Sequence, residues 1–539
     1  MGIFIYQELS KSITREEWKR VYEETLVLVD ALPLAERRTV TYAGKDLVCV
    51  MRTQERKTEW GTGWRASMDY FTLKEAEAYW VPRDLDGGKI DLAAGDAMMG
   101  ALPAYMDYDW EDERVNHTYS LWDAKTQGEP YHMYLLAVAC LIEDRLGEKA
   151  FVHGDITLGQ CRKAVELANR YLKEPIRVPS RCDAERLYSR VSSLPLGETE
   201  KLAVFECFYL GGKDKDFYAF EQKYFGPAII KEYWKKRFAD TPVGWEGFNR
   251  NLKRYLLSGL GLEELCRMAV LKDEEGNLQY EKFIKAVMDA KLHWKEKHTQ
   301  DCLEIDQDCE QPYSIWTLFA GFVFGSARNP KVDRYIPVEE IREALKRGLG
   351  TECDVDTYID QYLKEEADAP QVDISKENLS EEELAAMAKA DGAEVLTQFM
   401  DRTKDSLFSQ YAQYDIADYD DLIYFKKGNT IVPGLEKALK TSFSFYHGAV
   451  KEEVYRELMK AEPEDRCVYL IEANRRLLLR ECDWERIFSD IKEHPRAFAR
   501  YYPAVRVVAD SSELRQMVTA FVLNDELYAY VESHSSDNP

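Results

Sequence analysis

The sequence lacks the features that direct a chain to an oxidising compartment or a membrane. None of its 11 cysteines stands in a C-x-x-C pair, and an odd number of scattered cysteines predicts reduced thiols rather than a disulfide framework. The longest apolar run, residues 133–142, is far shorter than the roughly 20 residues of a membrane-spanning helix. The first residues show no basic stretch followed by an apolar core, so no secretory signal is predicted. We therefore expect a soluble, cytoplasmic protein without a membrane partner.

The sequence also lacks the short motifs that name a chemistry. It contains no G-x-S-x-G elbow, no H-E-x-x-H pair, no Walker loop and no dinucleotide fingerprint, and only eight histidines. Their absence removes motif support for the common hydrolases, zinc peptidases and nucleotide-binding enzymes, and no cofactor is predicted. An enzyme is not excluded, because catalytic groups can assemble from residues far apart in the chain.

The sequence has fewer basic than acidic residues. Lysine and arginine together number 72 against 97 for aspartate and glutamate, which gives a formal net charge of −25. Such a field repels phosphate backbones and favours basic partners, so it disfavours nucleic acid as a partner. Acidity also keeps a protein soluble without any partner, and net charge alone does not separate these two meanings.

The composition is that of a folded globular protein, with 45% hydrophobic and 31% charged residues. A chain of 539 residues exceeds the usual size of one domain. The patterning predicts a mainly α, multi-domain helical protein with a small α+β amino-terminal unit and a mixed α/β carboxy-terminal region. The expected divisions are a small α+β unit at 1–125, a helical core region at 126–310, a helical extension at 311–365, an acidic linker at 366–380 and a mostly helical region at 381–539.

Local patterns place the elements. Thr14 and Glu17 form a capping box at the start of an amphipathic helix over residues 14–32. Alternation around Ala43-Gly44-Lys45 predicts a β-hairpin over residues 39–51. Further expected elements are a strand at 63–70, a helix at 72–80, successive short helices from 185 to 298, a long helix at 381–413, a helix at 465–480 and strands at 505–508 and 527–531.

Residues 131–172 are the predicted centre of the helical region, as an apolar helix, a short buried strand and a second helix. Within them, His153-Gly154-Asp155 resembles the catalytic loop of kinase-like small-molecule phosphotransferases. In that loop an aspartate accepts the substrate proton and an asparagine five residues later holds magnesium. The resemblance implies that Asp155 is the base, but Gln160 stands at the later position and no glycine-rich phosphate loop precedes the motif.

A structural interpretation accounts for the same residues. Gly154 turns the chain after a strand at 150–153, and Thr157 caps the next helix with Gln160 at its third position, which is a capping box. Asp155 then lies near the helix start, where the helix dipole favours a negative charge. His153, Asp155 and Gln160 are therefore candidate site residues with a structural alternative.

A second group of residues suggests a metal site. On one continuous helix, His298, Cys302 and Cys309 would share a face at about 100° per residue, which makes them candidate zinc ligands. Trp294 and Ile305 fall on that face too, and structural zinc sites usually space paired ligands two to four residues apart. A buried core stripe explains the pattern as well as zinc does.

Two basic patches beside aromatic residues could contact nucleic acid, because bases stack on aromatic rings. The patches are Trp234 with Lys235, Lys236 and Arg237, and the group Arg475, Arg476, Arg480 and Arg486. The alternative is a pair of surface helices whose aromatic side chains face the core.

Three hypotheses follow. The first is a non-catalytic protein that acts through protein–protein contact, with a basic partner such as a toxin or nuclease. The alternative is a divergent phosphotransferase-like enzyme with a site near His153 and Asp155. The third is a nucleic-acid-binding protein, whose affinity would fall steeply with salt.

Overall fold

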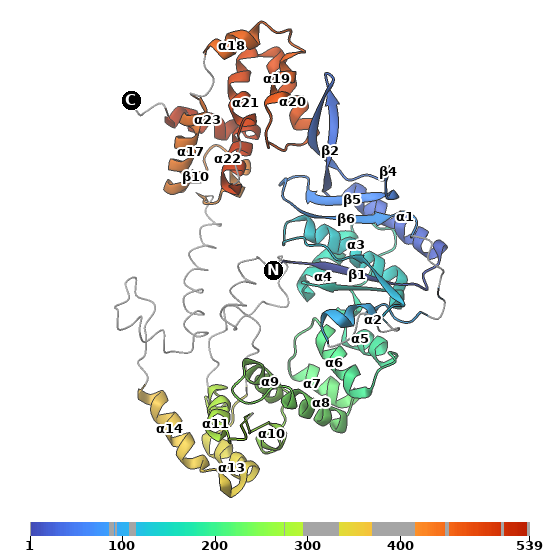
Figure 1. Ribbon diagram of the computed structural model, residues 1–539, viewed down its shortest axis with the longest axis vertical. Coiled ribbons are helices and arrows are strands. Elements are labelled where there is room, and N and C mark those ends of the chain that lie inside the picture. Colours follow the sequence, from blue (N-terminus) through green and yellow to red (C-terminus); the bar gives the residue numbers. More distant parts are fainter. Residues whose placement is uncertain are drawn as a thin grey trace.

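The computed structural model describes residues 2–85, 91, 94–106, 115–273, 275–294, 332, 334–368, 415–447, 452–507 and 511–535. Over these ranges the chain is mainly α-helical with a separate antiparallel sheet region, as the sequence predicted. Figure 1 shows the sheets between two groups of helices. Over the same ranges, no helix has both the length and the apolar character that crossing a membrane requires.

The amino-terminal region contains the larger sheet. Its strands run in the order β3-β2-β5-β4, with β6 on the other side of β5, and every pair is antiparallel. The elements are β1 (Ile5–Ser10), α1 (Arg15–Ala31), β2 (Leu34–Tyr42), β3 (Lys45–Arg52), β4 (Arg56–Thr58), β5 (Gly61–Asp69) and β6 (Glu75–Pro82).

The predicted first helix, hairpin and third strand are confirmed. Thr14 and Glu17 form the expected capping box of α1. Ala43 and Gly44 turn the hairpin with φ of 47° and 75°, the left-handed values that a two-residue hairpin loop requires. The predicted helix at 72–80 is wrong, because residues 75–82 pair with β5 as β6 and bury Tyr79 and Val81 on alternate positions.

A second sheet has the order β7-β1-β8, all antiparallel, with β7 at Thr118–Trp122 and β8 at Ala150–Gly154. The predicted helix–strand–helix of residues 131–172 is confirmed as α3 (Tyr131–Leu146), β8 and α4 (Leu158–Ala168). α3 is apolar on nearly all sides because it is buried on nearly all sides. Since β8 pairs with β1, one hydrophobic core runs from Ile5 to Ile176, across the expected division at residue 125.

A series of short helices follows, as the breaks at glycine and proline predicted. Asp183 and Asp214 cap two of them, and Pro227 opens a third at a position where its missing N–H costs nothing. The helices are α5 (Ala184–Ser192), α6 (Glu198–Phe208), α7 (Lys215–Tyr224), α8 (Pro227–Ala239), α9 (Glu246–Leu257), α10 (Leu262–Met268), α11 (Tyr280–Asp289), α13 (Val338–Leu349) and α14 (Val355–Asp368). Short helical turns between the sheets and these helices are α2 (Met98–Ala101), η1 (Leu102–Ala104), η2 (Gly147–Lys149) and η3 (Ser180–Cys182), with η4 at Gly350–Glu352.

The carboxy-terminal region is more helical than predicted. The expected strands at 505–508 and 527–531 are wrong, because Val505 ends α21 and residues 527–531 lie within α23, which buries Leu527 and Val531 one turn apart. The expected helix at 465–480 ends early, at Ala473. The elements are β9 (Asp415–Ile416), η5 (Tyr419–Tyr424), β10 (Thr430–Ile431), α17 (Pro433–His447), α18 (Glu452–Met459), α19 (Arg466–Ala473), α20 (Glu481–Glu493), η6 (Pro495–Ala497), α21 (Phe498–Val505), α22 (Ser512–Leu523) and α23 (Asp525–Ser535).

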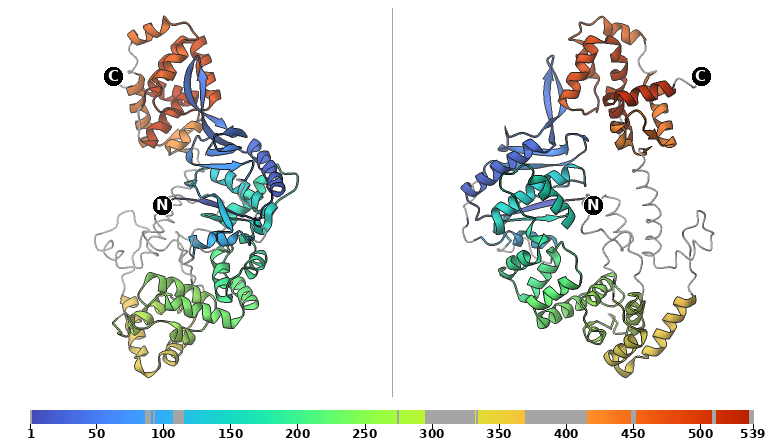
Figure 2. Two further views of the ribbon diagram at one scale, coloured as in Figure 1. Left: turned by 45° about the vertical axis from the view of Figure 1, so that its right-hand side comes forward. Right: turned by 180° about the vertical axis from the view of Figure 1, so that it is seen from behind.

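The carboxy-terminal helices pack on the β2–β3 hairpin, as both views of Figure 2 show. Leu47 and Cys49 of β3 share a buried cluster with Trp484 of α20. The Val50 N–H donates to the Leu479 carbonyl at 2.9 Å. The expected long helix at 381–413 and most of the expected linker at 366–380 lie outside the described residues.

Candidate functional site

His153, the candidate from the sequence, lies in β8 directly opposite Tyr6 of β1 and is 1% exposed. Its Nε2 is 3.4 Å from Glu8 Oε1, and its Nδ1 is 3.3 Å from the hydroxyl oxygen of Tyr105. Glu8 comes from β1, and Tyr105 directly follows η1. Antiparallel pairing and one turn therefore bring together three residues that are far apart in the sequence. We call Glu8, His153 and Tyr105 the relay.

The hydrogen bonds of the relay are consistent with one arrangement of protons. The Gly154 N–H donates to the Tyr105 hydroxyl oxygen at 3.0 Å, so the phenol proton is available for His153 Nδ1. The other ring nitrogen of His153 then carries its proton toward the Glu8 carboxylate. Gly154 allows this geometry, because it has a φ of 112° and a Cβ there would lie 2.6 Å from the Phe4 carbonyl oxygen.

Burial lowers the pKa of His153, and the nearby Glu8 carboxylate only partly opposes that effect. The imidazole is therefore neutral at neutral pH, with a lone pair that can accept a proton. Burial raises the pKa of the Tyr105 phenol, whereas the Arg181 guanidinium acts to lower it. At rest the phenol keeps its proton, and a neutral base stands beside it.

Aromatic rings hold the relay in place. The Tyr6 ring stacks on His153 at 4.8 Å and 12°, and Phe151 lies 5.9 Å from His153 on the same face of the sheet. The Tyr105 ring meets His153 edge-on at 5.6 Å. The residue as a whole is 38% exposed, while its hydroxyl lies against His153 and the Gly154 N–H. The relay therefore begins at a buried carboxylate and ends at a partly exposed tyrosine whose hydroxyl faces His153.

Arg181, in η3, is a buried cation next to the relay. It is 3% exposed, its Nε donates to the Phe208 carbonyl at 2.9 Å, and its Nη1 is buried without a hydrogen-bond partner in the described part of the chain. The guanidinium lies 5.5 Å from the centre of the Phe208 ring, which Tyr105 contacts edge-on at 5.2 Å. A buried donor without an acceptor is costly.

The other two candidates, Asp155 and Gln160, form hydrogen bonds with backbone groups. The Asp155 carboxylate accepts the Phe4 N–H at 3.0 Å, and the Asp155 N–H donates to the Phe4 carbonyl at 3.0 Å, which closes the end of the β1–β8 pair. Gln160 forms the predicted capping box with Thr157, with distances of 3.0 and 3.1 Å. The structural interpretation explains both residues.

A second buried cluster was not predicted. Glu206 of α6 is 2% exposed and forms an ion pair with Arg254 of α9, while Glu221 of α7 is 3% exposed. Arg254 holds the pKa of Glu206 low against the opposing effect of burial. Burial, with Glu206 close by, raises the pKa of Glu221 to about 9, and burial beside Arg254 lowers the pKa of Lys213 to about 8. Glu221 follows the apolar Phe217 and Tyr218 by four and three residues, a spacing that predicts a place on the buried face of α7. α6 has no clear amphipathic pattern, so no comparable pattern marks Glu206.

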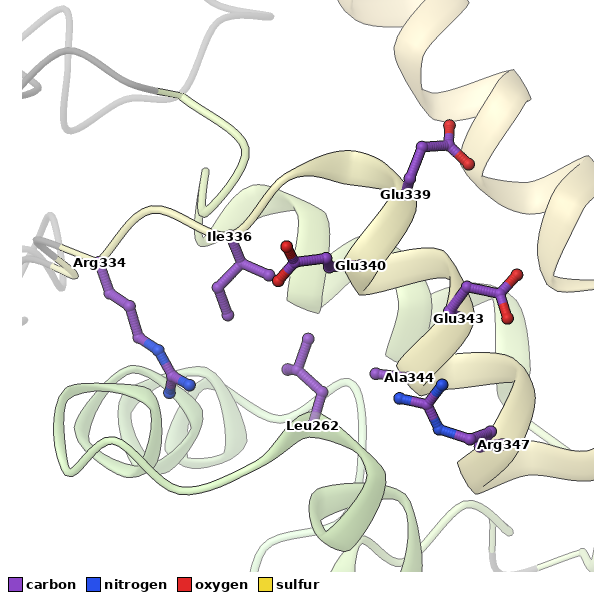
Figure 3. A pocket seen from close by; sticks show the side chains of 8 residues that line it. All are labelled: Leu262, Arg334, Ile336, Glu339, Glu340, Glu343, Ala344 and Arg347. Carbon is purple, nitrogen blue, oxygen red and sulfur yellow. The ribbon is translucent and has the colours of Figure 1, made fainter.

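A hollow of about 410 Å³ opens between α10 and α13. Figure 3 shows the Glu340 carboxylate turned toward Ile336 and into the hollow, with Leu262 and Arg334 on the opposite side. The eight residues that line it are Leu262, Arg334, Ile336, Glu339, Glu340, Glu343, Ala344 and Arg347. We call this feature the α10–α13 hollow.

The remaining sequence candidates are placed as follows. His298, Cys302 and Cys309 lie outside the described residues, so the zinc hypothesis stays a prediction. Among the residues that the structure describes, no three His, Cys, Asp or Glu side chains stand close enough to hold a metal. In the first basic patch, Trp234 is 1% exposed and its ring is in the core, where it offers no surface for a base.

Comparison with known proteins adds no identification. No family model, no curated protein and no solved structure matches this chain.

Proposed function

We propose that this protein acts in the cytoplasm by binding a basic protein partner, and that a lysine or arginine of the partner enters the α10–α13 hollow. The observation that carries the proposal is the position of Glu340. Its carboxylate faces the hollow, and no ion pair or hydrogen bond to it exists in the described part of the chain. An exposed carboxylate above an apolar floor suits a long basic side chain, whose stem is apolar and whose tip is charged.

The hollow has the size and lining of a side-chain pocket. It is a depression of about 410 Å³ that opens to solvent, so a side chain can enter it from outside. Leu262, Ile336 and Ala344 supply apolar surface from both elements that border it. An arginine or lysine flanked by apolar residues would contact both the apolar surface and the Glu340 carboxylate.

The two arginines at the hollow are already engaged with the protein itself. Arg334 donates to the carbonyls of Leu256 and Leu260 at 3.1 and 2.9 Å. Arg347 pairs with Glu263 at 3.2 Å. Among the described residues, neither arginine forms an ion pair with Glu340.

Charge over the whole chain supports the same partner class. A net charge of −25 attracts a basic protein from a distance and speeds encounter. A toxin or nuclease with a basic surface is a partner of this chemistry.

Fluorescence anisotropy with a labelled peptide of alternating arginine and leucine tests the proposal. We expect saturable binding at low salt that weakens at moderate salt, and no binding of the same peptide with glutamate in place of arginine. Equal binding of the two peptides, or no binding of the basic one, would overturn it.

A further inference from the structure

We propose that Tyr105 is a nucleophile toward phosphate esters, with His153 as the general base that takes its proton and Glu8 as the residue that positions His153. This activity is separate from partner binding at the α10–α13 hollow. It also differs from the phosphotransferase hypothesis, in which Asp155 is the base, because Asp155 is bonded to the backbone of Phe4.

Hydrogen-bond contacts link Glu8, His153 and Tyr105 in that order. A carboxylate, an imidazole and a hydroxyl in hydrogen-bond sequence form the arrangement by which proteins activate a hydroxyl nucleophile. Here the distances are 3.4 Å from Glu8 to His153 and 3.3 Å from His153 to Tyr105. Such contacts are often loose before a substrate binds and shorten in the reacting complex.

His153 has the protonation state that a general base requires. A general base must be neutral, and the burial of His153 among Tyr6, Phe151 and Tyr105 keeps it so. The charged and titratable groups that influence it are Glu8 from β1, Glu143 from α3 and Arg181 from η3. Of these, Glu8 makes the contact at Nε2, on the opposite side of the ring from the nitrogen that faces Tyr105.

Arg181 indicates that the electrophile is a phosphate ester. Arg181 has no carboxylate partner in the described part of the chain, and one of its nitrogens is buried without an acceptor. It lies against the same Phe208 ring as Tyr105. A preorganised cation at this position would stabilise the negative charge that develops on phosphoryl oxygens during transfer.

The reaction balances without a further reactant. The Tyr105 oxygen forms a bond to phosphorus as the bond from phosphorus to the leaving oxygen breaks, and the phenol proton passes to His153 Nδ1. The leaving oxygen, in line with and opposite the Tyr105 oxygen, takes a proton from water, and His153 releases its proton to water. In the second step His153 takes a proton from water, and the water oxygen bonds to phosphorus as the bond from phosphorus to the Tyr105 oxygen breaks. Phosphate leaves, and His153 returns the proton to the Tyr105 oxygen.

The test uses a dialkyl fluorophosphate, which reports the first step as a stable adduct because fluoride leaves and the ester persists. Peptide mass spectrometry of the full-length protein gives the labelling rate of Tyr105. Tyr171 and Tyr469 serve as internal controls, because they are exposed by 45% and 43%, against 38% for Tyr105. We expect Tyr105 to be labelled at least about 100-fold faster than either, the lower end of what general-base catalysis contributes.

The pH profile separates this mechanism from an accessible but ordinary tyrosine. An ordinary phenol reacts as its anion, so its labelling rises about tenfold per pH unit below its pKa of about 10. Labelling of Tyr105 by way of neutral His153 should be flat from about pH 7 to 9, since the base is already neutral across that range. A Tyr105 rate that rises with pH in parallel with Tyr171 would overturn the proposal, and this comparison needs no variant.

Variants assign the roles. We expect Tyr105→Phe to abolish labelling at this position, His153→Gln to slow it by about 100-fold and Glu8→Gln by about tenfold, because a base contributes more than the residue that orients it. With His153→Gln the remaining reaction should become dependent on pH like that of Tyr171. Unchanged labelling in a folded His153→Gln protein would also overturn the proposal.

Discussion

Glu8 of β1 and His153 of β8 lie on the same face of the three-stranded sheet, with the carboxylate 3.4 Å from the imidazole Nε2. They are 145 positions apart in the sequence. Both side chains are buried, at 6% and 1% exposure. Each therefore depends on the other to satisfy a polar group that water does not reach.

Replacing Glu8 by alanine should destabilise the fold, because the imidazole N–H loses its acceptor in the interior. We expect a loss of about 1–3 kcal/mol, the cost of an unsatisfied buried group. Glu8→Gln keeps an oxygen at the same place and should lose less. Urea denaturation of the two variants measures the difference, and equal losses would mean that the contact does not satisfy His153.

The elements that the sequence predicted are those determined by neighbouring residues. The capping boxes of Thr14 with Glu17 and of Thr157 with Gln160 each need only four consecutive residues. The hairpin turn at Ala43 and Gly44 is equally local. Local signals of this kind do not depend on the rest of the fold.

The wrong predictions of helix and strand fall on segments whose structure depends on contacts with distant parts of the chain. Residues 75–82 contain good helix formers, but they pair with β5, and pairing outweighs helix propensity. Residues 505–508 and 527–531 are short apolar runs, whose periodicity does not distinguish a strand from a helix turn.

In the candidate site too, the sequence identified a residue in a local motif and missed residues that only the fold brings together. His153 was identified because it belongs to the His153-Gly154-Asp155 motif, whereas Glu8 and Tyr105 belong to no motif. Tyr105 reaches His153 from a turn 48 positions away. Side chains that a fold brings together over such distances leave no spacing signal in one sequence.

Acid should destabilise the protein through His132. Burial lowers the pKa of His132 to about 4, below the value of about 6.5 for an unfolded chain. As pH falls, the unfolded state takes up the proton first, so the stabilisation is complete above about pH 6.5 and is lost as pH falls toward 4. The total is on the order of 3 kcal/mol. Urea midpoints across this range should fall more steeply for the wild type than for His132→Leu, and parallel curves would contradict the assignment.

The buried pair of Glu206 and Arg254 should behave as a unit. Arg254→Met leaves the Glu206 carboxylate without its ion-pair partner in the interior, and we expect a loss of about 3–5 kcal/mol. The double variant Glu206→Gln with Arg254→Met removes the stranded charge and should recover much of that loss. Thermal and urea unfolding of the single and double variants gives the coupling energy. Additive losses would show that the two groups do not interact.

The most direct measurement for the proposed function is the affinity of the arginine–leucine peptide for Glu340→Gln, compared with Glu16→Gln. Both residues are exposed glutamates in the first turn of a helix, α13 and α1. The two variants therefore change net charge and helix-dipole interaction alike. If the peptide arginine enters the hollow, Glu340→Gln should raise the Kd by roughly 10–100-fold, the worth of a charge-assisted hydrogen bond. Glu16→Gln should change it by less than about twofold, as expected for a screened surface charge. Equal small changes in both variants would show that only net charge attracts the peptide, and would contradict a binding site between α10 and α13.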